Sequence, residues 1–226
     1  MSDYNLPKGY LSYSSMNTWK SSKDQFRKKY YSSEPYNLET PYTRFGKEIA
    51  ETLEDPKATK AHPILSKIPS YDYPEYPLEV CIEGVPIKGF IDSFCTKEHK
   101  ILEYKTGIPK DGKAPWNPLK VRKHDQLLLY AVCVQELLGN VDPLVQLVWM
   151  ETEWAEECTD EYFNKKKFMT CQPALRLTGN FEVFDRTIEE WEHMRMRQDI
   201  VRIAEEISKD YTLYQQTGDK SLDTLT

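Results

Sequence analysis

Two short segments decide the fold of this chain: Ile87-Lys-Gly-Phe-Ile-Asp92 and Ile101-Leu-Glu-Tyr-Lys-Thr-Gly107. Both have the apolar character of strands, and the polar turn between them predicts that they pair as antiparallel neighbours. Glu103 and Lys105 are two residues apart, so they point to the same face of their strand. Asp92, at the end of the other strand, can lie opposite them. The sequence therefore predicts that two carboxylates and one ammonium group meet at one place on a sheet.

Such a cluster suits a divalent cation. Two neighbouring carboxylates repel each other, and one of them should bind a proton unless a cation removes the conflict. A ligand set made only of oxygen atoms favours Mg²⁺ or Mn²⁺. The metal would activate a water and neutralise the charge of a phosphodiester, and the lysine would position that water or stabilise the transition state. The alternative is a solvent-facing ladder of salt bridges across a hairpin, since opposite charges are common on paired strands.

Helices and strands follow one another on both sides of this pair. Helices are expected over residues 11–31, 45–54 and 123–138 and after a capping box at Thr187 and Glu190, and strands over residues 78–82, 85–95, 101–105 and 145–150. Residues 56–77 are expected to form a loop, and residues 151–180 have no clear pattern. This order predicts an α/β or α+β fold with a central mixed β-sheet flanked by helices. We expect residues 1–226 to form one domain with N-terminal helices and a C-terminal helical extension.

Composition narrows the class of protein. The 226 residues are 39% hydrophobic and 29% charged, which is typical of a globular chain. The net charge of −6 argues against a passive, charge-driven nucleic-acid binder, although residues 105–123 are locally basic. No apolar run is long enough to span a membrane, and the N-terminus lacks a secretory signal, so a cytoplasmic location is expected. The five cysteines are odd in number and form no Cys-x-x-Cys pair, which argues against a disulfide framework or a zinc ribbon.

A helix with a recognisable pattern follows the two strands. In His124-Asp-Gln-Leu-Leu-Leu-Tyr130, the side chains of Gln126 and Tyr130 lie one helical turn apart on the same face, so both can reach one phosphate or base. Packing of Tyr130 and simple exposure of Gln126 are the alternative. Near the N-terminus are the stretch Leu11-Ser-Tyr-Ser-Ser-Met-Asn-Thr-Trp19 and the pair Phe45-Gly46, each leading into a predicted helix.

In this order, these motifs closely resemble the PD-(D/E)XK nuclease superfamily, in its RecB-like and lambda-exonuclease-like branches. The resemblance spans residues 11–130 and implies a restriction-endonuclease-like core. It implies that Asp92 and Glu103 bind the metal together with the backbone carbonyl of Tyr104. It also implies that Lys105 lies by the attacking water.

The chain departs from the family pattern at one metal ligand. RecB-like nucleases usually carry a histidine where this chain has Ala50, and the lambda-exonuclease branch has a glutamate there. On a helix, Glu51 and Glu54 lie about 100° and about 40° from Ala50, whereas Glu48 faces roughly away. We expect Glu51 to replace the missing ligand, with Glu54 as the second choice. All three being ordinary surface residues is the alternative.

The iron–sulfur branch of the family is a poor match. Its N-terminal cysteine corresponds to Ser22 here, and Cys158 and Cys171 are too few and too far apart for its C-terminal cluster, so no iron–sulfur cluster is expected.

These observations predict a Mg²⁺- or Mn²⁺-dependent DNA exonuclease for recombination or repair, of the kind found in phages. Asp92, Glu103 and Lys105 would be the catalytic residues, and Gln126 and Tyr130 would orient the substrate strand. The alternatives are an endonuclease on the same core and an inactive module that binds DNA ends or a partner protein, which the loss of a ligand at Ala50 would allow. A homo-oligomer and a recombination partner both stay open.

Overall fold

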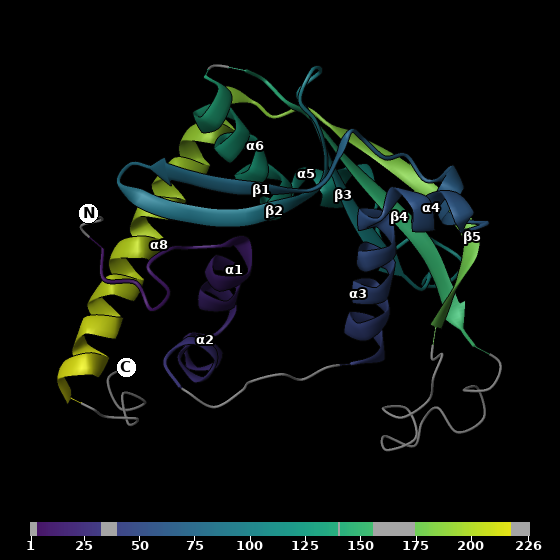
Figure 1. Cartoon of the computed structure of the whole chain (residues 1–226). Coiled ribbons are helices and arrows are strands. Elements are labelled where there is room, and N and C mark those ends of the chain that lie inside the picture. Colours follow the sequence, from purple (N-terminus) through teal and green to yellow (C-terminus); the bar gives the residue numbers. More distant parts are fainter. Residues whose placement is uncertain (1–3, 33–39, 140, 156–174, 218–226) are drawn as a thin grey trace.

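The centre of the molecule is a five-stranded sheet (Figure 1) in the computed structural model, which describes residues 4–32, 40–139, 141–155 and 175–217. In spatial order, the strands are β1 (Tyr73–Ile82), β2 (Val85–Cys95), β3 (Lys100–Gly107), β4 (Leu144–Trp154) and β5 (Leu175–Arg186). β3 and β4 are parallel and every other neighbouring pair is antiparallel, so the sheet is mixed. The predicted class is therefore confirmed: an α+β fold with a central mixed sheet, consistent with a restriction-endonuclease-like core.

Helices cover the sheet on two sides (Figure 1). They are α1 (Tyr13–Ser21), α2 (Lys23–Tyr30), α3 (Pro41–Glu54), α4 (Pro56–Ala61), the short 3₁₀ helix η1 (Leu65–Lys67), α5 (Pro118–Arg122), α6 (Asp125–Leu138) and α8 (Glu190–Thr217). One apolar core joins α1, α2, α6 and α8 to the sheet, and a second joins α3 and η1 to β3 and β4. Ile101 belongs to the first core and Leu102 to the second, as the alternation of side chains along a strand requires. β3 thus separates the two layers.

One predicted helix is in fact a pair of helices. The helix expected over residues 11–31 is broken at Ser22, whose extended backbone ends α1 and whose hydroxyl accepts the Gln25 N–H at 3.3 Å. Because the serine side chain satisfies a free N–H of the new helix, a second N-terminus forms there. The helix expected over residues 123–138 begins at Asp125, and the separate helix α5 precedes it.

The predicted loop over residues 56–77 contains structure. Asp55 caps α4 by accepting the Lys57 N–H at 2.8 Å, and Pro56 occupies the first helical position, where its missing N–H costs nothing. β1 already begins at Tyr73. β5, which lies within and after the region without a clear pattern, was not predicted at all.

The C-terminal helix begins later than its predicted capping box. The Glu192 side chain accepts the backbone N–H of Glu189 at 3.1 Å. This contact, from a glutamate back to the residue before the helix, was predicted between Glu190 and Thr187, so the start of α8 lies two residues later than predicted. The shift follows from Arg186, because its ion pair with the other oxygen of Glu192 holds that side chain at the helix start. Within the described ranges, no helix is long and apolar enough to cross a membrane.

Candidate active site

The site lies at the point where β2 and β3 separate, which we call the β2–β3 fork. The two strands pair from Cys95 back to Ser93, and the ladder ends there. The next step would set Asp92 against Glu103. Instead, the backbone N–H of Tyr104 donates to Asp92 Oδ2 at 2.8 Å. The Asp92 side chain thus takes the place of a backbone carbonyl as the acceptor for Tyr104. The backbone pairing of the two strands ends between Asp92 and Glu103.

Four of the predicted residues form one connected chain on the α6 side of β3. The Lys105 ammonium group contacts Glu103 Oε1 and also donates to Gln126 Oε1 at 3.1 Å. Gln126 Nε2 in turn donates to Tyr130 Oη at 3.0 Å. The strand periodicity of β3 and the helix periodicity of α6 therefore bring the expected catalytic and substrate-binding side chains together.

Glu103 is the buried centre of this chain. Its side chain is 2% exposed, and Oε2 has no hydrogen-bond partner among the described residues. A buried carboxylate oxygen without a partner loses its hydration, which is costly. This oxygen therefore keeps its capacity to accept a ligand, which a carboxylate in an ordinary packed core would not.

Electrostatics point the same way. Burial raises the pKa of Glu103 to about 7, against the opposing charge of Lys105 and with a smaller contribution from Asp92. Burial also raises the pKa of Asp92, although the Tyr104 N–H and the charge of Lys105 act in the opposite direction. For Lys105, burial would lower the pKa, but the charge and hydrogen bond of Glu103 outweigh it and raise the pKa. The positive charge of Lys105 therefore only partly offsets the effect of burial on the Asp92 and Glu103 carboxyls.

The helix ligand expected at Glu51 is not brought to this place. The Glu51 side chain is 62% exposed and lies 3.7 Å from Lys47. Glu54 faces the sheet instead: burial raises the pKa of its carboxyl first, followed by the charge of Glu75 and a hydrogen bond with it, and by the charges of Glu51 and Asp92. The second choice of the sequence analysis is therefore the better placed one.

Glu75 was missed by sequence reasoning. The β1–β2 ladder is regular on both sides of Glu75 and Asp92 but is not formed at that pair, and the charge of Glu75 raises the pKa of Asp92. Glu75 has a φ of 48°, a strained conformation for a residue with a side chain. Glu75 was missed because the neighbouring prolines Pro74 and Pro77 indicated a loop rather than a strand.

As the side chains stand, no three His, Cys, Asp or Glu residues within the described ranges converge as a metal-binding group. Cys158 and Cys171, which entered the expectation about an iron–sulfur cluster, lie outside those ranges. The orphaned oxygen of Glu103 beside Asp92 is nevertheless the donor chemistry that Mg²⁺ and Mn²⁺ prefer.

Solvent can approach Asp92 from the opposite face of the sheet. A cavity of about 250 Å³ is lined there by Asp92, Ser93 and Tyr104 and by side chains from α3, α4 and η1. Asp92 therefore lies between this cavity and the Glu103–Lys105 side of the fork.

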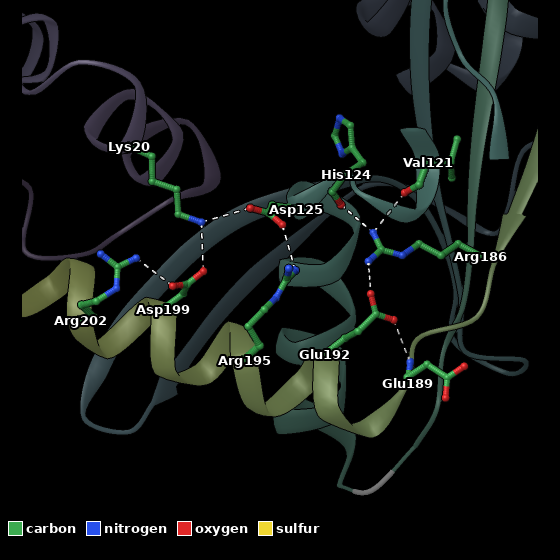
Figure 2. Close-up of polar contacts among 10 residues, drawn as sticks. All are labelled: Lys20, Val121, His124, Asp125, Arg186, Glu189, Glu192, Arg195, Asp199 and Arg202. Atoms are coloured by element: carbon green, nitrogen blue, oxygen red, sulfur yellow. Dashed lines mark hydrogen bonds and ion pairs between the residues drawn. The ribbon is translucent and has the colours of Figure 1, made fainter. Parts of the chain in front are cut away.

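A buried ion pair holds the helix that carries Gln126 (Figure 2). Arg186, at the end of β5, pairs with Glu192 at 3.1 Å, and both side chains are at most 3% exposed. Arg186 also donates to the backbone carbonyls of Val121 at 3.2 Å and His124 at 2.7 Å. It thereby joins the start of α8 to the junction of α5 and α6.

Asp125, the first residue of α6, is held by side chains of α1 and α8. Lys20 of α1 donates to it at 3.1 Å and Arg195 of α8 at 3.2 Å, as Figure 2 shows. Its neighbour Gln126 consequently occupies a helix end that is fixed by three other elements.

Comparison with known proteins gives only distant structural likeness. No family model and no curated protein matches the chain. A phage-related exonuclease from Haemophilus somnus 129PT is similar at 12% identity, over 92% of this chain and 86% of that chain, with a TM-score of 0.46. The protein designated SSO0001 is similar at 14% identity, over 86% of this chain and 76% of that one, with a TM-score of 0.41. Function must therefore be inferred from the residues of the site.

Proposed function

We propose that this protein is a metal-dependent deoxyribonuclease, acting as an exonuclease, with its active centre at the β2–β3 fork. One observation supports this most directly: Glu103 is buried, one of its oxygens contacts Lys105, and the other has no partner among the described residues. A salt-bridge ladder in solvent, which is the alternative for these charges, would not be buried in this way.

Asp92 and Glu103 would hold Mg²⁺ or Mn²⁺, with the backbone carbonyl of Tyr104 as a third donor. Glu54 takes the role first given to Glu51, because its carboxyl interacts with those of Glu75 and Asp92. When bound, the metal would supply a water of lowered pKa and would neutralise charge on the phosphodiester.

The remaining residues act on the water and the strand. Lys105 keeps its charge beside Glu103, and an ammonium group there would donate to the attacking water and to the negative charge that develops on phosphorus oxygens. Gln126, bonded to both Lys105 and Tyr130, would orient the phosphate backbone at the point of attack.

The test is degradation of end-labelled linear and circular DNA with Mg²⁺, Mn²⁺ or EDTA. We expect metal-dependent loss of linear DNA only, abolished by Glu103→Gln and by Lys105→Ala. Glu79→Gln and Lys88→Ala are matched controls, because these side chains form an exposed ion pair on β1 and β2. Cutting of circles would identify an endonuclease. Binding of DNA ends without hydrolysis would identify the inactive module that Ala50 suggested.

A further inference from the structure

Three aromatic side chains from separate segments lie against one another next to the proposed site, one pair stacked and the other tilted by 53°. The rings of Tyr13, the first residue of α1, and His124 lie 5.9 Å apart at an angle of 26°. The ring of Trp116, from the loop after β3, lies 5.0 Å from that of His124. All three side chains are half-buried, so each keeps surface open to solvent. We call these three residues the aromatic shelf.

The aromatic shelf adjoins the catalytic chain. His124 is the residue that precedes α6, and Gln126, two residues later, binds Lys105. The charges of Lys105 and Glu103 both act on the Tyr13 hydroxyl, and the charge of Lys105 acts on the His124 ring. A group resting on the shelf would therefore lie beside the groups proposed to cleave the strand.

The His124 ring does not cap the helix that it precedes. It occupies the N-cap position of α6, where serine, threonine, aspartate or asparagine usually bonds a free N–H, yet its side chain makes no such bond. Its backbone carbonyl binds Arg186, but its ring atom Nδ1 is buried without a partner among the described residues. The ring therefore serves the contacts with Tyr13 and Trp116 rather than the helix.

The segment that carries Trp116 is positively charged. The loop that carries Trp116 also carries Lys110 and Lys113, both exposed, and Lys120 donates to the backbone carbonyl of Pro115 at 2.5 Å. Aromatic rings that stack on bases, beside cations that follow the phosphate backbone, are the usual means of holding single-stranded nucleic acid.

We propose that the aromatic shelf receives an unpaired nucleobase of the DNA strand being cleaved, so that the substrate of this site is a strand end whose terminal bases are unpaired. The inference rests on the proposed function for its choice of ligand. Because every base has a π face, the shelf would accept any sequence.

The test measures binding rather than cleavage, with the hydrolysis-deficient variant Glu103→Gln. Its probes are single-stranded oligonucleotides with an ordinary nucleotide or an abasic residue at either end. We expect the abasic residue at one end to weaken binding about tenfold. Tyr13→Leu or Trp116→Leu in the same background should remove that difference, and Tyr13→Trp should retain it. Trp191→Leu, which removes an exposed tryptophan of α8, is the matched control.

A terminal 5-iodouracil provides a second readout, because light cross-links it to a stacked aromatic ring. Cross-links to Tyr13, His124 or Trp116 would support the proposal. Equal affinity for ordinary and abasic ends, or cross-links only elsewhere, would overturn it even if the protein is a nuclease. A base-dependent difference in a wild-type protein that degrades no DNA would refute the nuclease and keep the shelf.

Discussion

The backbone N–H of Tyr104 donates to the carboxylate of Asp92 at 2.8 Å, at the point where β2 and β3 stop pairing. Asp92 therefore has two separable roles. Its side chain accepts a backbone hydrogen bond of the half-buried strand β3, and it is a proposed metal ligand. The two roles respond differently to substitution.

Asp92→Asn keeps an oxygen that can accept the Tyr104 N–H, whereas Asp92→Ala leaves that N–H unsatisfied. We expect both variants to lose nuclease activity, but only the alanine variant to lose about 1–3 kcal/mol of unfolding free energy relative to wild type. Urea denaturation measures the difference. Equal stability of the two variants would mean that the hydrogen bond does not support the fork.

The stability of the metal-free protein should depend on pH through Glu103. Its pKa is raised in the folded state from 4.5 to about 7, so the folded protein binds this proton more tightly than the unfolded chain does. Stability is therefore lost as pH rises between those values, by at most about 3 kcal/mol. Unfolding at pH 5 and pH 8 should show a smaller loss in Glu103→Gln than in wild type. Mn²⁺ should stabilise wild type more at pH 8 than at pH 5, and the reverse order would contradict the assignment.

Glu51 and Glu54 lie less than one helical turn apart on α3, so substituting each one tests which of them supports the metal. Glu54→Gln should weaken Mn²⁺ binding about tenfold, as loss of a supporting carboxylate commonly does, because this carboxyl faces Glu75 and Asp92. Glu51→Gln should leave binding unchanged, because its side chain is exposed beside Lys47. Titration calorimetry with both variants decides between them, and a larger effect at Glu51 would restore the original assignment.

The strained backbone at Glu75 predicts a trade between stability and activity. Glycine adopts a φ of 48° without strain, so Glu75→Gly should leave the protein as stable as wild type or more stable by about 1 kcal/mol. Activity should fall, because a carboxylate opposite Asp92 is lost. Glu83→Gly is the control: Glu83 has a φ of 49° in the β1–β2 turn, and its replacement should not change activity. If the two variants retained equal activity, Glu75 would have no part in the site.

The buried pair of Arg186 and Glu192 should support the fold and the placement of α6. Arg186→Met leaves a buried carboxylate unpaired and should cost about 3–5 kcal/mol, whereas replacing both residues by apolar ones should cost less than the two single changes together. A double-mutant cycle by urea denaturation measures this coupling. Additive costs would mean that the two side chains do not act as a pair.

Much of the site followed from local periodicity. Glu103 and Lys105 share a face because strand side chains alternate, and Gln126 and Tyr130 share a face because four residues make about one helical turn. The same reasoning predicted a mixed sheet flanked by helices. It failed where a side chain ends or begins an element, as Ser22 does between α1 and α2.

By itself, therefore, the sequence determined which side chains lie together on a single strand or helix. Only the tertiary structure decided which elements face one another. The burial of Ile49 and Leu53 rotates α3 so that Glu54 faces the sheet, and the register of β1 sets Glu75 against Asp92. Rotation and register depend on packing between residues far apart in the chain, which no local pattern encodes.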